Sequence, residues 1–236
     1  FAIFAAERGC EQIRNSICYP KMNVKVAATH AGISVGEDGA SHQAVEDIAI
    51  MRSLANMVVI SPADATETRL AVKAAIEHDG PVYLRLGRLA VPTLFDENYK
   101  FELGKGVTLA DGKDVTIVAT GLLVQYALEA KDILAKEGIE ARVINIHTIK
   151  PIDEEIIIKA AKETGALVTA EEHNIIGGLG SAVAEVLAEN YPVPLKRVGV
   201  EDKFGKSGKP AKLLEMYGLT AENIVNKAKE AMKIKK

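Results

Sequence analysis

The sequence predicts an α/β protein with two consecutive domains, each a mostly parallel sheet with helices on both faces. Strand-like and helix-like segments alternate along almost the whole chain, a pattern typical of parallel sheets. The alternation lapses between residues 93 and 113 and then resumes, which divides the chain in two. The length of 236 residues corresponds to one to two domains, and a hydrophobic content of 48% is that of a globular chain.

The first domain is predicted to span residues 1–92. Because the chain opens without Met and inside an apolar segment, we expect this domain to lack its start and the chain to be part of a longer polypeptide. Apolar residues at spacings of four, three and four from Ala6 to Ile17 indicate a helix over residues 1–18. The motif SPAD (61–64) suits the first turn of a helix that continues to residue 77. The remaining elements are predicted as strands at 24–29, 57–60 and 81–86 and a helix at 42–54.

Residues 93–113 are predicted to form a linker, because charged residues and glycines are frequent there and only residues 106–109 look strand-like. The second domain is predicted to span residues 114–236. Its strands are expected at 115–119, 141–146, 166–171 and 195–200. Its helices are expected at 122–136, 154–162, 181–189, 210–217 and 221–232.

The composition argues against a general nucleic-acid or anionic-membrane binder. Lys and Arg number 29 against 32 Asp and Glu, whereas such binders carry a basic excess. There is no Trp for a base-stacking platform, and no apolar run approaches the ~18 residues that span a membrane. Cys10 and Cys18 would lie about 12 Å apart on one helix, too far for a disulfide. Two free thiols suit a reducing cytoplasm.

The loop after the predicted strand at 24–29 is the first candidate site, because ligands of open α/β sheets bind beyond the carboxyl ends of strands. It reads THAGISVGEDGASH (residues 29–42), with two histidines, two carboxylates and three glycines. This density of polar groups suits a polyhydroxylated or phosphorylated small molecule. The string GEDG is also a common surface turn, and spacing alone slightly favours that interpretation. A metal site is a third, weaker alternative, because the histidines lack zinc or EF-hand spacing.

Two further positions are candidates for ligand contact. Arg85 and Arg88 end the predicted strand at 81–86, where an arginine can bind a phosphate bidentately. The alternative is a surface arginine paired with a nearby carboxylate. On a continuous helix, Phe4 points about 180° away from Ile13, at ~100° per residue. Phe4 is therefore either a core or interface side chain or the wall of a ligand pocket.

Other motifs are predicted to be structural. The segment GGLGS (177–181) precedes a helix but lacks the lysine of a P-loop, so we interpret it as a close-packing turn. His78, His147 and His173 are isolated and are predicted to be hydrogen-bonded structural residues. The motifs GxSxG, CxxC and HExxH, which mark common hydrolases and zinc enzymes, do not occur in the sequence.

Short sequence motifs occur in both halves of the chain, and they are informative when they are considered together. The first half contains FAIF (1–4), EQIR (11–14), THAGISVGEDG (29–39), SPAD (61–64) and LGR (86–88). The second half contains HTIKPID (147–153), GGLG (177–180) and SGKP (207–210), followed by LL (213–214). Together they resemble the pyrimidine-binding and C-terminal domains of transketolase, over essentially the whole chain. His30, the GEDG loop and His42 favour transketolase over two similar enzymes, deoxyxylulose-phosphate synthase and the β subunits of 2-oxo-acid dehydrogenases.

The resemblance implies the transfer of a two-carbon ketol unit from a ketose phosphate to an aldose phosphate in the pentose phosphate pathway, with thiamine diphosphate and Mg²⁺ as cofactors. Phe4 would stack on the aminopyrimidine ring of the cofactor. His30 and Arg88 would hold the substrate phosphate. Asp38 would hydrogen-bond a substrate hydroxyl beside the reacting carbonyl, and His42 would contact the two-carbon unit. Asp38 and His42 are thus the candidate catalytic residues.

The resemblance also implies that this chain is inactive alone. In the family, a glutamate upstream of the FAIF segment activates the cofactor, and a separate N-terminal domain binds the diphosphate and Mg²⁺. Neither is present in this sequence, so no metal ligand is expected here, and neither Glu7 nor Glu11 is assigned the activating role. Expected partners are an N-terminal transketolase section, a second copy of this region in a homodimer, and sugar phosphates. The alternatives are another thiamine enzyme or a non-catalytic dimerisation or regulatory subunit.

Overall fold

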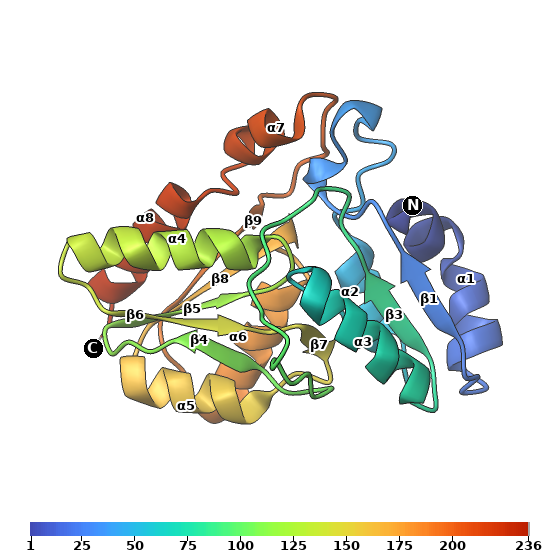
Figure 1. Cartoon of the computed structure of the whole chain (residues 1–236), viewed down its shortest axis with the longest axis horizontal. Helices are drawn as coiled ribbons and strands as arrows, with labels where there is room; N and C mark the ends of the chain where they lie inside the picture. Colours follow the sequence, from blue (N-terminus) through green and yellow to red (C-terminus); the bar gives the residue numbers. More distant parts are fainter. Residues whose placement is uncertain (236) are drawn as a thin grey trace.

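The computed structural model describes residues 1–235, which form two sheets with helices packed against them (Figure 1). The first sheet has the strand order β1 (Lys25–Ala28), β3 (Val82–Arg85), β2 (Val58–Ile60) and β7 (Thr148–Lys150). β1, β3 and β2 are parallel, so their carboxyl ends share one edge of the sheet. β7 comes from the second half of the chain and pairs antiparallel with β2. The strand at residues 148–150 is not predicted from the sequence, because its partner strand is remote in sequence.

The second sheet has the order β4 (Val107–Ala110), β6 (Ala141–Asn145), β5 (Val115–Ala119), β8 (Leu167–Asn174) and β9 (Leu195–Val200). It is parallel except for β4, which runs antiparallel to β6. Side chains of α4 (Leu123–Lys136) and α8 (Ala221–Lys233) share one core cluster, and those of α5 (Glu154–Thr164) and α6 (Leu179–Asn190) share another. The predicted fold class, mostly parallel sheets with helices on both faces, is confirmed.

The first sheet is covered by N-terminal helical turns and α2 (Asp47–Ser53) on one side and by α3 (Ala65–Glu77) on the other. The turns comprise η1 (Phe4–Arg8), α1 (Cys10–Gln12) and η2 (Ile13–Cys18). η1 and η2 are wide π turns, in which the Gly9 amide donates to the Phe4 carbonyl at 3.0 Å. Helix α3 begins at an N-cap, Asp64, whose side chain accepts the Glu67 amide at 2.7 Å.

The predicted helix at 42–54 is wrong over residues 42–46, because α2 covers only Asp47–Ser53. The Gly32 amide donates to the Ala44 carbonyl at 2.8 Å, and the Asn174 amide donates to the Val45 carbonyl at 2.8 Å. These tertiary hydrogen bonds hold residues 42–46 between the loop after β1 and the end of β8. His42 therefore lies in a loop rather than on a helix.

The predicted linker at 93–113 contains β4, which joins the second sheet. Its first part packs on α3: Phe95 is buried, and the Asp64 carboxylate accepts the Leu94 and Phe95 amides at 2.7 and 2.9 Å. The division of the chain into 1–92, 93–113 and 114–236 stays a prediction. Two short helical segments, η3 (Ile33–Asp38) and α7 (Pro210–Met216), lie side by side at the top of Figure 1. None of the helices within residues 1–235 combines the length and apolar character needed to cross a membrane.

Candidate functional site

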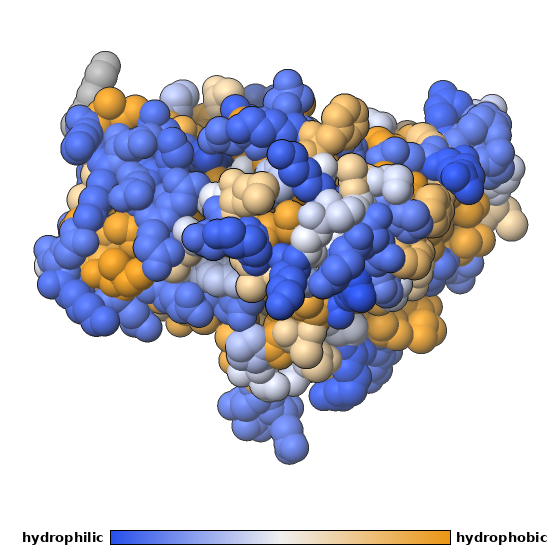
Figure 2. Space-filling view, turned by 90° about the horizontal axis from the view of Figure 1, so that it is seen from above, coloured by the Kyte–Doolittle hydropathy of each residue, from blue (hydrophilic) through white to orange (hydrophobic). Residues whose placement is uncertain are grey.

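The loop after β1 is folded back on itself by glycines. Gly32, Gly36 and Gly39 have φ values of +87°, +86° and +77°, which glycine adopts without the penalty of a side chain. The Gly39 amide donates to the Gly36 carbonyl at 3.2 Å, and the His42 amide donates to the Gly39 carbonyl at 2.9 Å. Asp38 and His42 are therefore held within one compact turn. Figure 2 views the end of the molecule at which η3 and α7 lie, and hydrophobic residues are scattered there among hydrophilic ones.

Four rings from three segments form one cluster beside this turn. The ring centroid of Phe1 lies 4.3 Å from that of His30 and 5.3 Å from that of His42. The Phe4 ring lies 5.3 Å from the His42 ring, nearly edge-on. The structure thus brings together three of the predicted site residues, Phe4, His30 and His42.

The other two predicted site residues form an ion pair. Arg88 Nη1 lies 3.1 Å from Asp38 Oδ2 and 3.9 Å from Glu37 Oε2, and it also donates to the Val35 carbonyl. The side chains of Arg88 and Asp38 are 38% and 42% exposed, so a ligand can reach both. A paired surface arginine was the alternative interpretation of Arg88. Asp38 fixes this guanidinium at the edge of the loop.

Arg85, the other arginine predicted as a phosphate ligand, is structural instead. It is buried, with Nε 2.8 Å from Asp47 Oδ2 and Nη2 3.1 Å from Asp47 Oδ1. The Tyr83 hydroxyl donates to the same carboxylate at 2.8 Å. Burial alone would raise the pKa of Asp47, but the charge and hydrogen bonds of Arg85 outweigh it and hold that pKa below its usual value. Of the two interpretations left open for Arg85, phosphate binding and pairing with a carboxylate, the structure supports the pairing, in a buried rather than a surface position.

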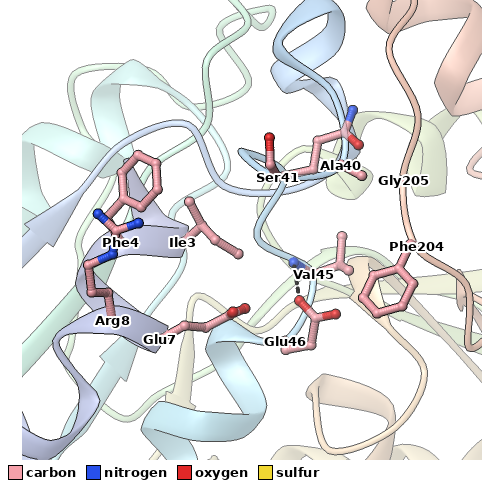
Figure 3. Close-up of a pocket in the computed structure, with 11 residues that line it drawn as sticks. Ile3, Phe4, Glu7, Arg8, Ala40, Ser41, Val45, Glu46, Phe204 and Gly205 are labelled. Atoms are coloured by element: carbon pink, nitrogen blue, oxygen red, sulfur yellow. Dashed lines mark hydrogen bonds between the residues drawn. The ribbon is translucent and has the colours of Figure 1, made fainter.

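A cavity of about 460 Å³ adjoins the ring cluster (Figure 3). It opens between η1, the residues after Gly39 and the 204–205 segment of the second half of the chain. Glu7 and Glu46 extend toward each other across it (Figure 3). Burial and the neighbouring Glu46 carboxylate raise the pKa of Glu7 to about 7. Sequence reasoning missed Glu46 and Phe204, because no spacing relates either residue to Phe4.

The isolated histidines are structural, as predicted for His147 and His173. Burial lowers the pKa of each to about 4, so both are neutral at pH 7. His173 Nε2 accepts the Ala49 amide at 3.3 Å, and the His147 ring lies 4.1 Å from that of Phe101. The segment GGLG is a close-packing turn, because the Glu171 carboxylate occupies the amides at the start of α6 and would collide with a Cβ at residue 178.

The residues present fit one end of thiamine diphosphate. Phe4 and Ile3 line the cavity and offer an aromatic and apolar wall to a flat heteroaromatic ring such as an aminopyrimidine. Within residues 1–235, no three His, Cys, Asp or Glu side chains are grouped so as to hold a metal ion. This part of the chain therefore offers a surface that can hold the ring, but no group of three such side chains that could coordinate the metal ion of the diphosphate.

Family models place the chain within one family. Residues 1–93 match the transketolase pyrimidine-binding domain, and residues 104–224 match the transketolase C-terminal domain. A provisionally named transketolase C-terminal section from Methanocaldococcus jannaschii is 52% identical over 236 residues, which cover 99% of this chain and 74% of the relative. The 6-deoxy-6-sulfo-D-fructose transketolase subunit SqwH of a Clostridium species is 48% identical, over 98% of this chain and 71% of the relative.

A solved split-gene transketolase, described as an inactive β4 tetramer, has a TM-score of 0.95 and 58% sequence identity, covering 100% of this chain and 76% of that one. The relatives also include 1-deoxy-D-xylulose-5-phosphate synthases, for example from Heliobacterium modesticaldum. The two family models together cover nearly all of the sequence, and the solved structure shares both sheets. The chain belongs to the transketolase family, of which it carries the pyrimidine-binding and C-terminal domains.

Proposed function

We propose that this chain is the C-terminal subunit of a transketolase. Together with an N-terminal section, it transfers a two-carbon ketol unit from a ketose phosphate to an aldose phosphate, as in the pentose phosphate pathway. The observation that carries the proposal is the loop after β1. It presents His42 against Phe4 and His30 against Phe1, and it pairs Asp38 with Arg88, so aromatic, hydroxyl-binding and anion-binding groups meet at one sheet edge.

Phe4 holds the aminopyrimidine ring of thiamine diphosphate in this proposal. The partner section supplies the diphosphate site, its Mg²⁺ ligands and the activating glutamate. When bound, the cofactor stabilises the carbanion of the transferred unit. This chain's own residues bind and orient the sugar and exclude water around the ring.

The sugar is held by the remaining four predicted residues. His30 and Arg88 bind the phosphate, with Arg88 turning from Asp38 toward the incoming anion. Asp38 accepts a hydrogen bond from a hydroxyl beside the reacting carbonyl, and His42 contacts the hydroxyl or carbonyl of the two-carbon unit. The imidazoles can donate or accept, which suits a substrate whose hydroxyl groups do both.

Assembly is part of the proposal. The similar split-gene protein is described as inactive when it is a tetramer of β chains, which supports a requirement for a partner section. We place a second copy of this region in the active assembly, as a dimer, and the protein in the cytoplasm, where Cys10 and Cys18 remain free thiols.

The test is reconstitution with the N-terminal section, followed by assays with a ketose phosphate or pyruvate as donor. We expect activity with the ketose phosphate, dependent on thiamine diphosphate, Mg²⁺ and both chains. Activity with pyruvate alone would instead assign a deoxyxylulose-phosphate synthase, a reaction found among the relatives. No transfer from either donor, with the complex intact and thiamine diphosphate bound, would assign a non-catalytic subunit.

A further inference from the structure

The loop after β1 (residues 29–42), here called the substrate loop, packs closely against the second half of the chain. A Cβ built on Gly36 would lie 2.9 Å from Pro210 Cγ, and one on Gly39 would lie 2.4 Å from Ser207 Oγ. Gly36 and Gly39 therefore have two effects. They allow the positive φ of the turn, and they let the loop approach the start of α7 and the residues just before it. The position of Asp38, between these glycines, therefore depends on residues 207–210 of the second half of the chain.

One buried side chain ties the loop to that segment. The side-chain amide of Gln43 is 2% exposed, and its Nε2 donates to the carbonyls of Ile33, Gly36 and Lys206 at 3.1, 3.3 and 2.9 Å. Ile33 and Gly36 lie in the first half of the loop, whereas Lys206 lies beyond the end of β9. A single amide group thus joins the loop after β1 to the segment beyond β9.

The environment of Gln43 permits only one orientation of the amide. Three carbonyl oxygens face Nε2, and a carbonyl oxygen can only accept. Oε1 is buried without a partner among the described residues, and a Cβ on Gly205 would lie 1.7 Å from it. An apolar side chain of the same length would fill this space but make none of the three hydrogen bonds, and a carboxylate would face three oxygens.

These hydrogen bonds bear directly on the Asp38–Arg88 pair. Gly36, whose carbonyl Gln43 holds, follows Val35, whose carbonyl accepts from Arg88, and precedes Asp38 by two residues. We propose that Gln43 is a positioning residue: by clamping the loop to the Lys206 carbonyl, it sets where Asp38 and Arg88 meet the sugar. The proposal rests on the proposed function, and it assigns the C-terminal domain a part in substrate binding.

The activity test is a double-mutant cycle in the complex reconstituted with the N-terminal section. Gln43→Met should raise KM for the ketose phosphate and lower kcat/KM by about 10- to 100-fold, the loss typical of a misplaced binding group. In an Asp38→Ala/Arg88→Ala background, the same change should cost less than about threefold, because both groups that Gln43 positions are gone. Equal losses in both backgrounds would overturn the proposal. Gln125→Met, on α4, is the matched control and should keep wild-type kinetics.

A second control removes the effect of lost stability. Val186→Ala removes two buried methyl groups from α6, which is far along the chain from the loop. The change should lower the free energy of unfolding without raising KM. If Val186→Ala at a similar loss of stability raised KM as much as Gln43→Met does, the effect of Gln43 would be structural, and the positioning role would be refuted.

Hydrogen exchange of this chain tests the clamp independently of activity. In Gln43→Met, the Gly39 and His42 amides should exchange at least about tenfold faster, while amides of β5 keep their protection. Unchanged loop protection would refute the clamp whatever the kinetics. If the wild-type complex shows no ketol transfer but Gln43→Met still loses loop protection, the proposed function fails and the clamp stands.

Discussion

Arg88 Nη1 and Asp38 Oδ2 lie 3.1 Å apart, although the two residues are 50 positions apart in the chain. The pair brings the end of β3 against the tip of the loop after β1. Both side chains are more than a third exposed, so we expect the ion pair to contribute less than about 1 kcal/mol to stability. In the proposed function, the pair matters because it holds an anion-binding group and a hydroxyl-binding group at one place.

Asp38→Ala should lower kcat/KM of the reconstituted enzyme by about 10- to 100-fold with little change in stability. The reason is the loss of a charged hydrogen bond to the sugar, worth about 1.5–3 kcal/mol. Glu37→Ala is the matched control, because Glu37 Oε2 lies 3.9 Å from the same guanidinium on the same loop. Steady-state kinetics should separate the two variants, and equal losses would remove the role assigned to Asp38.

His30→Ala should raise KM for phosphorylated sugars about tenfold and change KM for unphosphorylated sugars by less than about twofold. A charge-assisted hydrogen bond to a phosphate oxygen is worth more than one to a neutral hydroxyl. The measurement compares a sugar phosphate with the free sugar in the same complex, with His78→Ala, at the C-cap of α3, as the control. A similar rise in KM for both sugars would count against phosphate binding by His30.

Arg85→Ala should lower the free energy of unfolding by about 3–5 kcal/mol. The change leaves the Asp47 carboxylate buried without its cation, and an uncompensated buried charge is strongly destabilising. Urea denaturation of the chain measures the effect. Glu185→Ala, which breaks the exposed pair with Arg52, should cost no more than about 1 kcal/mol. If the two variants lost equal stability, the buried pair would not hold α2 against the first sheet.

His147→Phe should flatten the loss of stability in acid. The pKa of His147 is lowered from 6.5 to about 4, so below pH 6.5 the unfolded chain takes up a proton that the folded chain does not. The contribution of neutral His147 to the free energy of unfolding is therefore complete above pH 6.5 and falls as the pH drops toward 4. Between pH 7.5 and 5, the wild type should lose about 2 kcal/mol more than the variant.

Denaturation of both proteins at each pH cancels the contributions of all other titrating groups. An unchanged slope in His147→Phe would show that His147 titrates alike in the folded and unfolded chains.

The elements that the sequence predicts best are those with a strong local pattern. β5 and β9 begin and end at the predicted residues, and α4 differs by one residue at its start. β5 (VTIVA) is buried at every position and apolar except at Thr116, and α4 is a long amphipathic helix. Such patterns depend only on neighbours in the chain, so periodicity can identify them.

Elements decided by remote partners were missed or misjudged. Residues 42–46 have a helical pattern, but Gly32 and Asn174 donate hydrogen bonds to Ala44 and Val45 and keep them out of α2. β7 is a short strand whose partner, β2, lies about 90 residues earlier. Local propensity is worth only a few tenths of a kcal/mol per residue, so two or three tertiary hydrogen bonds override it.

The residues of the candidate site also form two groups, those that the sequence identifies and those that only the tertiary structure identifies. Motifs and the family resemblance named Phe4, His30, Asp38, His42 and Arg88, because chemically distinctive residues stand at strand ends and in one glycine-rich loop. Glu46, Phe204 and the clamp residue Gln43 carry no comparable signal. They gain their roles only through contacts with segments far away in sequence.

The sequence by itself determined the α/β class, the order of most strands and helices, the family and the residue types of the candidate site. Tertiary structure alone decided that Arg85 is buried in an ion pair while Arg88, three residues later, lies within reach of solvent beside Asp38. It also decided that the loop after β1 is joined to the second half of the chain by the hydrogen bond from Gln43 to the Lys206 carbonyl. Periodicity records which face of an element is apolar, whereas burial, pairing and hydrogen bonding of a polar group depend on which remote segment packs against it.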